Sequence, residues 1–145
     1  MTLVKDLMQK EVATLGAADH LDVAGDIMGL ERIRHLPVLD AGRIVGVVSQ
    51  RDLFRAGISS VLQFRRTTER EWLAKISVRE VMVKPVVTIG SQEPIRHAVK
   101  QMIDKKIGCL PVVDNGKLAG LLSETDLLNH LVRLIDRDES ERWPA

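Results

Sequence analysis

The feature that most limits what this chain can fold into is an internal duplication with a period of about 74 residues. Residues 4–8 match residues 78–82, residues 36–40 match residues 110–114, and residues 46–53 match residues 120–127. No gap is needed over roughly 50 aligned positions, and about a third of these positions are identical. We therefore expect two tandem copies of one folding unit.

Within each copy the apolar residues change their spacing in the same order. Residues 12–15 and 86–89 predict short strands that end at Gly16 and Gly90. A helix is predicted next, because apolar residues recur at helical spacing in both copies: Leu21, Ala24, Ile27 and Met28, then Ile95, Ala98, Val99 and Met102. Two further apolar runs follow in each copy, and the tight turn between them (residues 40–42 or 114–116) predicts a hairpin. A second helix ends each copy.

A unit of this size has an apolar sheet face and two apolar helix stripes that it cannot bury alone. The predicted fold class is therefore α/β (α+β), with two β-α-β-β-α repeats packed about a pseudo-twofold axis. By sequence, residues 1–60 form the first repeat, 61–77 a connecting helical segment, 78–136 the second repeat and 137–145 a C-terminal tail. Val61, Leu62, Trp72 and Leu73 predict that the connecting segment packs in part.

Composition argues against several classes of protein. The chain has 21 lysines and arginines, 20 aspartates and glutamates and a net charge of +1, without a basic block that could hold nucleic acid. No apolar stretch approaches the roughly 20 residues that a membrane span needs, and the N-terminus lacks the apolar core of a signal peptide. Cys109 is the only cysteine, so no intramolecular disulfide can form. We expect a cytoplasmic protein that binds neither nucleic acid nor membranes.

A serine followed three residues later by an aspartate lies at the same place in both copies, between a strand and a helix. Ser49 with Asp52 and Ser123 with Asp126 fit a helix-capping box, which can be their complete role. The same geometry also suits a nucleotide, because a helix N-terminus attracts phosphate and a carboxylate accepts hydrogen bonds from ribose hydroxyls. Ser123 and Thr125 would suit the phosphate. Both interpretations stay open at this point.

The doubled motifs resemble a pair of cystathionine β-synthase (CBS) domains, called a Bateman module, over about residues 4–131. The resemblance implies that an adenosine nucleotide binds between the copies, at sites that combine residues of both. The first implied site consists of Thr14, the backbone around Arg34, His35 and Pro37, and then Ser123, Thr125 and Asp126. The second consists of Thr88, the backbone around Cys109 and Pro111, and then Ser49, Arg51 and Asp52.

The two implied sites are not equivalent. Arg51 stands where the first site has Thr125, which removes a compact hydroxyl and adds a cation that can pair with phosphate. We therefore rank the site of Asp126 first. His35 either reaches a phosphate or caps a strand end, and Cys109, at the matching position, is expected to be an inert core residue. No metal site is expected, because the spacing of His20, His97 and His130 is not that of metal ligands.

No arrangement of residues in the sequence indicates an enzyme. It has no nucleophile with a base, no Walker-type phosphate loop and no need of a catalytic cofactor. The first hypothesis is a regulatory protein that binds AMP, ADP, ATP or S-adenosylmethionine and relays occupancy to a regulated protein that the sequence does not identify. The resemblance also implies a homodimer. The second hypothesis is a ligand-free module for dimerisation or protein interaction, for which Trp143 in the polar tail offers a contact.

Overall fold

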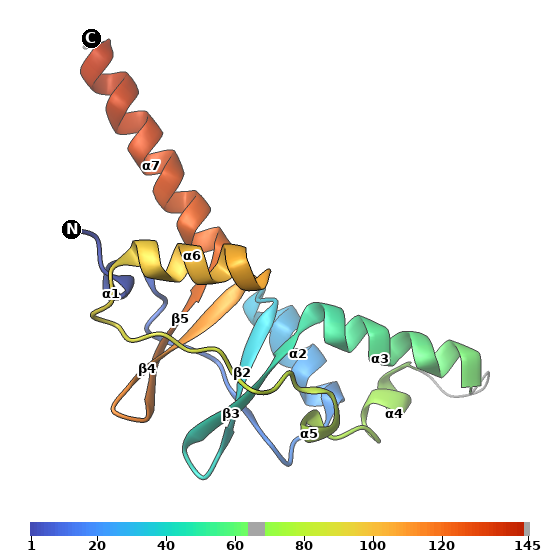
Figure 1. Ribbon diagram of the computed structural model, residues 1–145. Helices are drawn as coiled ribbons and strands as arrows, with labels where there is room; N and C mark the ends of the chain where they lie inside the picture. The colour runs from blue at the N-terminus through green and yellow to red at the C-terminus, as the bar shows by residue number, and fades with distance from the viewer. Residues whose placement is uncertain (64–68, 144–145) are drawn as a thin grey trace. The chain divides into compact units, whose positions relative to one another are not determined.

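The computed structural model describes residues 1–63 and 69–143, with side chains at all of these except 58–63 (Figure 1). The chain forms two compact units, and each is described by itself. One consists of Val12–Val86 and is called the first-repeat unit. The other combines Met1–Glu11 with Val87–Ala145 and is called the second-repeat unit.

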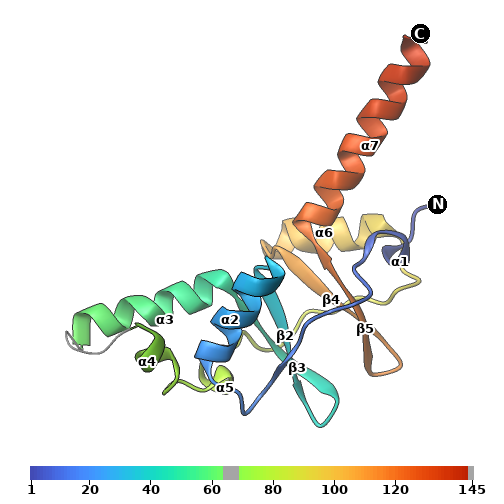
Figure 2. The ribbon, with the colours of Figure 1, turned by 180° about the vertical axis from the view of Figure 1, so that it is seen from behind.

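The first-repeat unit is a small sheet with helices (Figures 1 and 2). In chain order its elements are β1 (Leu15–Gly16), α2 (Leu21–Glu31), β2 (His35–Asp40), β3 (Arg43–Ser49), α3 (Gln50–Gln63), α4 (Glu69–Leu73) and α5 (Val78–Val81). The strand order is β1-β2-β3, with β1 parallel and β3 antiparallel to β2. Helices α2, α3 and α4 contact one another, and α5 contacts β3.

The second-repeat unit has the same plan. Its elements are α1 (Val4–Leu7), α6 (Ile95–Lys105), β4 (Cys109–Asp114), β5 (Lys117–Ser123) and α7 (Glu124–Arg142). Strands β4 and β5 form an antiparallel hairpin, α6 contacts β4, and α1 contacts both β5 and α7. The residues predicted as a tail therefore belong largely to α7, which continues to Arg142. No helix among the described residues is both long enough and apolar enough to cross a bilayer.

The duplication is confirmed in the details of the backbone. Helices α2 and α6 both end on a residue in the left-handed region, Arg32 (φ 54°) and Lys106 (φ 53°). Both hairpin turns place two successive residues at positive φ, Ala41 and Gly42 or Asn115 and Gly116, as a primed two-residue turn requires. Even the bulge in the two hairpins lies at the same repeat position, after Val38 and after Val112. The predicted fold class is thus confirmed: each repeat is a small sheet with helices.

The first strand of each repeat is shorter than predicted. Only Leu15 and Gly16 pair with β2, and in the second repeat only Ile89 forms a bridge, with Val112. The prolines of the neighbouring strands explain this. Extending the parallel ladder backwards would need the backbone N–H of Pro37 or Pro111, and proline has none.

The short helix that opens each repeat packs on the other repeat. Val4 of α1 is fully buried in the core of the second-repeat unit, and Val78 of α5 is fully buried in that of the first-repeat unit. Gln9 and Leu121 exchange backbone hydrogen bonds of 2.9 and 3.0 Å, and Val83 and Val47 exchange the matching pair. The boundaries predicted at residues 60, 77 and 136 therefore describe the repeats of the sequence. The compact units have other boundaries, because each contains the opening helix of the other repeat.

The connecting segment packs through the apolar residues near its end. Leu73 is buried, and the indole N–H of Trp72 donates to the carbonyl of Ala56 at 2.9 Å. Arg70 forms a two-pronged ion pair with Asp26 at 2.7 and 2.9 Å, which ties α4 to α2. The side chains of Val61 and Leu62 lie outside the described part of the chain.

Candidate functional site

Each serine–aspartate pair forms a capping box at the start of a helix. In the first repeat, Asp52 Oδ2 accepts from the backbone N–H and the hydroxyl of Ser49, both at 2.8 Å. In the second repeat, Asp126 Oδ2 accepts from the same two groups of Ser123, at 2.8 and 3.0 Å. The capping interpretation is therefore correct for both pairs, and in each it uses one oxygen of the aspartate. The other oxygen, Oδ1, is the one that a ligand could use.

The backbone that precedes each hairpin lies beside the cap of its own repeat. The amide of Gln50 donates to the carbonyl of Arg34 at 2.7 Å, and that of Glu124 donates to Gly108 at 3.0 Å. Across the hairpins, His35 pairs with Ser49 and Cys109 pairs with Ser123. The helix N-terminus, the capping aspartate and the strand start are thus neighbours within each unit.

The residues of the first predicted site come from both units. Thr14 and His35 are half-buried, Arg34 is exposed, and Pro37 is fully buried, all in the first-repeat unit. Ser123, Thr125 and Asp126 lie together where α7 begins, in the second-repeat unit. Because the ring of Pro37 is buried, only the backbone beside it can reach a ligand. The grouping of these residues into one site stays a prediction.

The residues of the second predicted site also come from both units, with the roles of the two units exchanged. Thr88 is exposed, and Cys109 and Pro111 are buried in the second-repeat unit, whereas Ser49, Arg51 and Asp52 lie at the start of α3. Burial, followed by the charge of Glu124, raises the pKa of the Cys109 thiol to about 12. The thiol is therefore protonated at neutral pH and is no nucleophile.

Sequence reasoning missed Gln9. Its side-chain amide donates to Asp126 Oδ1 at 2.8 Å, which occupies the aspartate oxygen that the cap leaves free. The matching residue of the other repeat is Val83, which has no side-chain donor. This exchange of a polar for an apolar residue is the signal in the sequence that could have drawn attention to it.

A hollow of about 440 Å³ in the second-repeat unit lies between Thr88 and α6. Thr88 alone of the predicted site residues lines it. Two polar side chains on α6 are already engaged with neighbours that also line the hollow: Lys100 forms an ion pair with Asp104 at 3.1 Å, and His97 hydrogen-bonds Glu93 at 2.7 Å. The hollow thus offers an anion little that is unpaired, so we place the candidate site at the capping aspartates instead. Among the described residues, no group of side chains could hold a metal ion.

Comparison with known proteins gives a consistent result. The family model of the CBS domain matches residues 4–59 and 78–133. A CBS domain-containing protein of Dictyostelium discoideum is 35% identical over 136 residues, which cover 92% of this chain and 94% of that protein. AcuB of Vibrio cholerae, named for acetoin utilization, is 33% identical, with a TM-score of 0.78 and 97% of both chains covered. The CBS domain pair of protein MJ0100, in complex with 5′-methylthioadenosine and S-adenosyl-L-methionine, is 26% identical with a TM-score of 0.76, over 90% of this chain and 99% of that one.

Proposed function

We propose that this chain, which belongs to the CBS domain family, is a non-catalytic regulatory protein that binds an adenosine-type ligand. The observation that carries the proposal is the repeated corner in which a capping aspartate, a helix N-terminus and a strand start are neighbours. A carboxylate oxygen beside a helix N-terminus can accept from the hydroxyls of a ribose while the helix attracts a phosphate or carboxylate. The adenosine ligands of the MJ0100 pair support the same chemistry here.

The ligand is proposed to be AMP, ADP, ATP or S-adenosylmethionine, acting as a regulator and not as a catalytic cofactor. A ligand that contacts two units shifts the population of their arrangements only through a difference in affinity between those arrangements. Such a shift would relay occupancy to a regulated protein. Binding at each site is proposed to use the residues that the sequence assigns to it.

Thermal unfolding with a panel of these four compounds tests the proposal. A compound present at 100 times its dissociation constant stabilises the folded chain by about 2.7 kcal/mol. Asp126→Ala and Asp52→Ala each remove an acceptor for ribose hydroxyls, and each is expected to weaken binding at its own site by about ten- to a hundredfold. If none of the four compounds moves the unfolding curve of the wild-type chain, the proposal is wrong.

A control is needed because both aspartates also cap helices. Asp19 accepts from the amide of Gly16 at 2.7 Å, three residues back, as the two capping aspartates do from their serines. It lies outside both predicted sites, so Asp19→Ala should lower stability without changing the shift that a ligand produces. Equal weakening of ligand binding by Asp19→Ala would mean that loss of a local aspartate–amide hydrogen bond alone, and not loss of a ligand contact, explains the other two variants.

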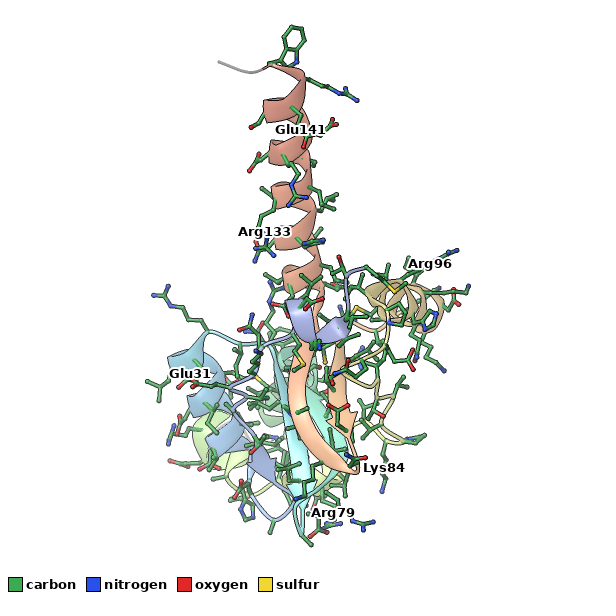
Figure 3. The ribbon with its side chains drawn as sticks, turned by 90° about the vertical axis from the view of Figure 1, so that its left-hand side faces the viewer. Glu31, Arg79, Lys84, Arg96, Arg133 and Glu141 are labelled. Atoms are coloured by element: carbon green, nitrogen blue, oxygen red, sulfur yellow. The ribbon has the colours of Figure 1, made fainter. Side chains whose placement is uncertain are left out.

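A second function, association with another copy of this chain, is favoured by α7. Every described residue from Leu131 to Trp143 is exposed, and Leu128, Leu131, Val132 and Ile135 form one apolar stripe at helical spacing. Figure 3 shows the part of α7 that carries Arg133 and Glu141 extending beyond β4 and β5. Exposed apolar stripes of this kind mark interaction surfaces. We propose a homodimer in which α7 is covered.

Sedimentation of the full chain tests the homodimer. Leu131→Glu places a carboxylate in the middle of the stripe and is expected to convert a dimer into a monomer, because a charge cannot be buried in an apolar interface without a partner. Asn129→Glu adds the same group on another face of α7 and should leave the dimer intact. A monomeric wild-type chain at all concentrations contradicts the proposal.

A further inference from the structure

The two capping aspartates differ in how much of the carboxylate remains available. Both use Oδ2 for the serine of the cap. At Asp126, Oδ1 also accepts a hydrogen bond of 2.8 Å from the Gln9 amide, and the residue is only 8% exposed. At Asp52, which is half-buried, Oδ1 has no hydrogen-bond partner within the described residues. One repeat thus presents an open acceptor and the other an occupied one.

Gln9 is held in place by its backbone and not by its side chain. Its N–H and C=O pair with Leu121 at 2.9 and 3.0 Å, and its carbonyl lies over Gly120, where an added Cβ would come within 2.6 Å. The residue itself is exposed. The backbone bridge therefore holds the side-chain amide of Gln9 within reach of Asp126, yet this side chain can change its rotamer and move away without disturbing the core.

The first-repeat unit has the same backbone arrangement, but without a side-chain hydrogen-bond donor. Val83 forms the same bridge with Val47, at 2.9 and 3.3 Å, and is exposed like Gln9. A valine side chain cannot reach across to a carboxylate with a hydrogen bond. The exchange of glutamine for valine is therefore one difference between the surroundings of Asp126 and those of Asp52, and it decides whether a side-chain donor lies at the carboxylate.

We propose that Gln9 is a built-in competitor for the Asp126 carboxylate, and that a ligand with a vicinal diol binds first at Asp52. The inference rests on the proposed function. A diol at Asp126 must displace a hydrogen bond to a charged group, which is among the stronger kinds, whereas a diol at Asp52 displaces only water. This reverses the order of the two sites that the sequence suggested from Arg51 and Thr125.

Exchange of the two residues provides the test, with isothermal titration of the full chain by AMP and by S-adenosylmethionine. Gln9→Met keeps the length of the side chain and removes the donor. In a chain that carries Asp52→Ala, which weakens the other site, it should raise the affinity at the site of Asp126 about tenfold. In a chain that carries Asp126→Ala, Val83→Gln should lower affinity at Asp52 by about the same factor. Lys10→Met, one residue along the same exposed segment, should change neither.

The possible outcomes separate the two proposals. If neither compound binds the wild-type chain, the proposed function fails, and this inference fails with it. If a compound binds the wild-type chain but Gln9→Met leaves the affinity at Asp126 unchanged, the inference alone is wrong. Amide NMR gives an independent check without ligand: the side-chain NH₂ signals of Gln9 should shift in Asp126→Asn, and unchanged signals would overturn the competitor role.

Discussion

Replacing Gly120 by alanine should loosen the N-terminal segment from the rest of the second-repeat unit. Gly120 lies in β5 at the point where residues 8 and 9 cross it. An added Cβ would come within 2.6 Å of the Gln9 carbonyl oxygen and 2.8 Å of the Met8 sulfur. The carbonyl cannot retreat freely, because it accepts the hydrogen bond from the Leu121 amide. We therefore expect the added methyl group to break the bridge between Gln9 and Leu121.

The size of the effect follows from these contacts. Loss of two backbone hydrogen bonds costs about 2 kcal/mol, and residual overpacking against Met8 adds about 1 to 3 kcal/mol. Alanine also restricts the unfolded chain more than glycine does, which raises the free energy of unfolding by up to about 1 kcal/mol. The net loss in the free energy of unfolding should be about 2–4 kcal/mol. This is a large share of the stability of a small domain.

Urea unfolding with hydrogen exchange measures both parts of this prediction. Gly120→Ala should lower the midpoint and remove the protection of the Gln9 and Leu121 amides. Gly46→Ala, at the matching position of β3, should cost less, because the three atoms nearest to its Cβ belong to the side chain of Met82 and none is a backbone oxygen. Gly29→Ala in α2 meets nothing within 4 Å and should be neutral or slightly stabilising. If Gly120→Ala is as stable as Gly29→Ala, residues 8 and 9 do not cross β5 as closely as these distances indicate.

Three further predictions concern single residues. Iodoacetamide at pH 8 should not label Cys109 in the folded chain but should label it in urea. Burial raises the pKa of the folded thiol to about 12, so the unfolded chain loses the thiol proton first. The free energy of unfolding should therefore fall as the pH rises from about 9 towards 12. Hydrogen bonds from Ser91, chiefly from its hydroxyl and to a smaller extent from its backbone amide, lower the pKa of Asp114. The stability that these bonds contribute is therefore present above about pH 4 and is lost as the pH falls further. Ser91→Ala should raise the pKa of Asp114 in an NMR titration. Leu110→Ala, in the core, should cost about 2–5 kcal/mol by urea unfolding, whereas Leu30→Ala, at 84% exposure, should change stability by less than about 0.5 kcal/mol.

Much of the local structure could be predicted because its signals are local. A helix stripe, a two-residue turn and a capping box each depend on residues a few positions apart, and the repeat supplied every signal twice. The turn at Asn115 and Gly116 and the caps at Ser49 and Ser123 are as expected. The length of the first strands was misjudged, because it depends on the missing N–H of a proline in a neighbouring strand.

The sequence by itself determined that the chain contains two copies of one unit, with a capping aspartate at the start of the last helix in each copy. Only the tertiary structure decided which copy receives each opening helix. Residues 4–8 and 78–82 are so alike that either could dock on either hairpin, and no local pattern distinguishes the two arrangements. The packing of α1 within the second-repeat unit brings Gln9 to Asp126, a contact across 117 positions that depends on long-range packing alone.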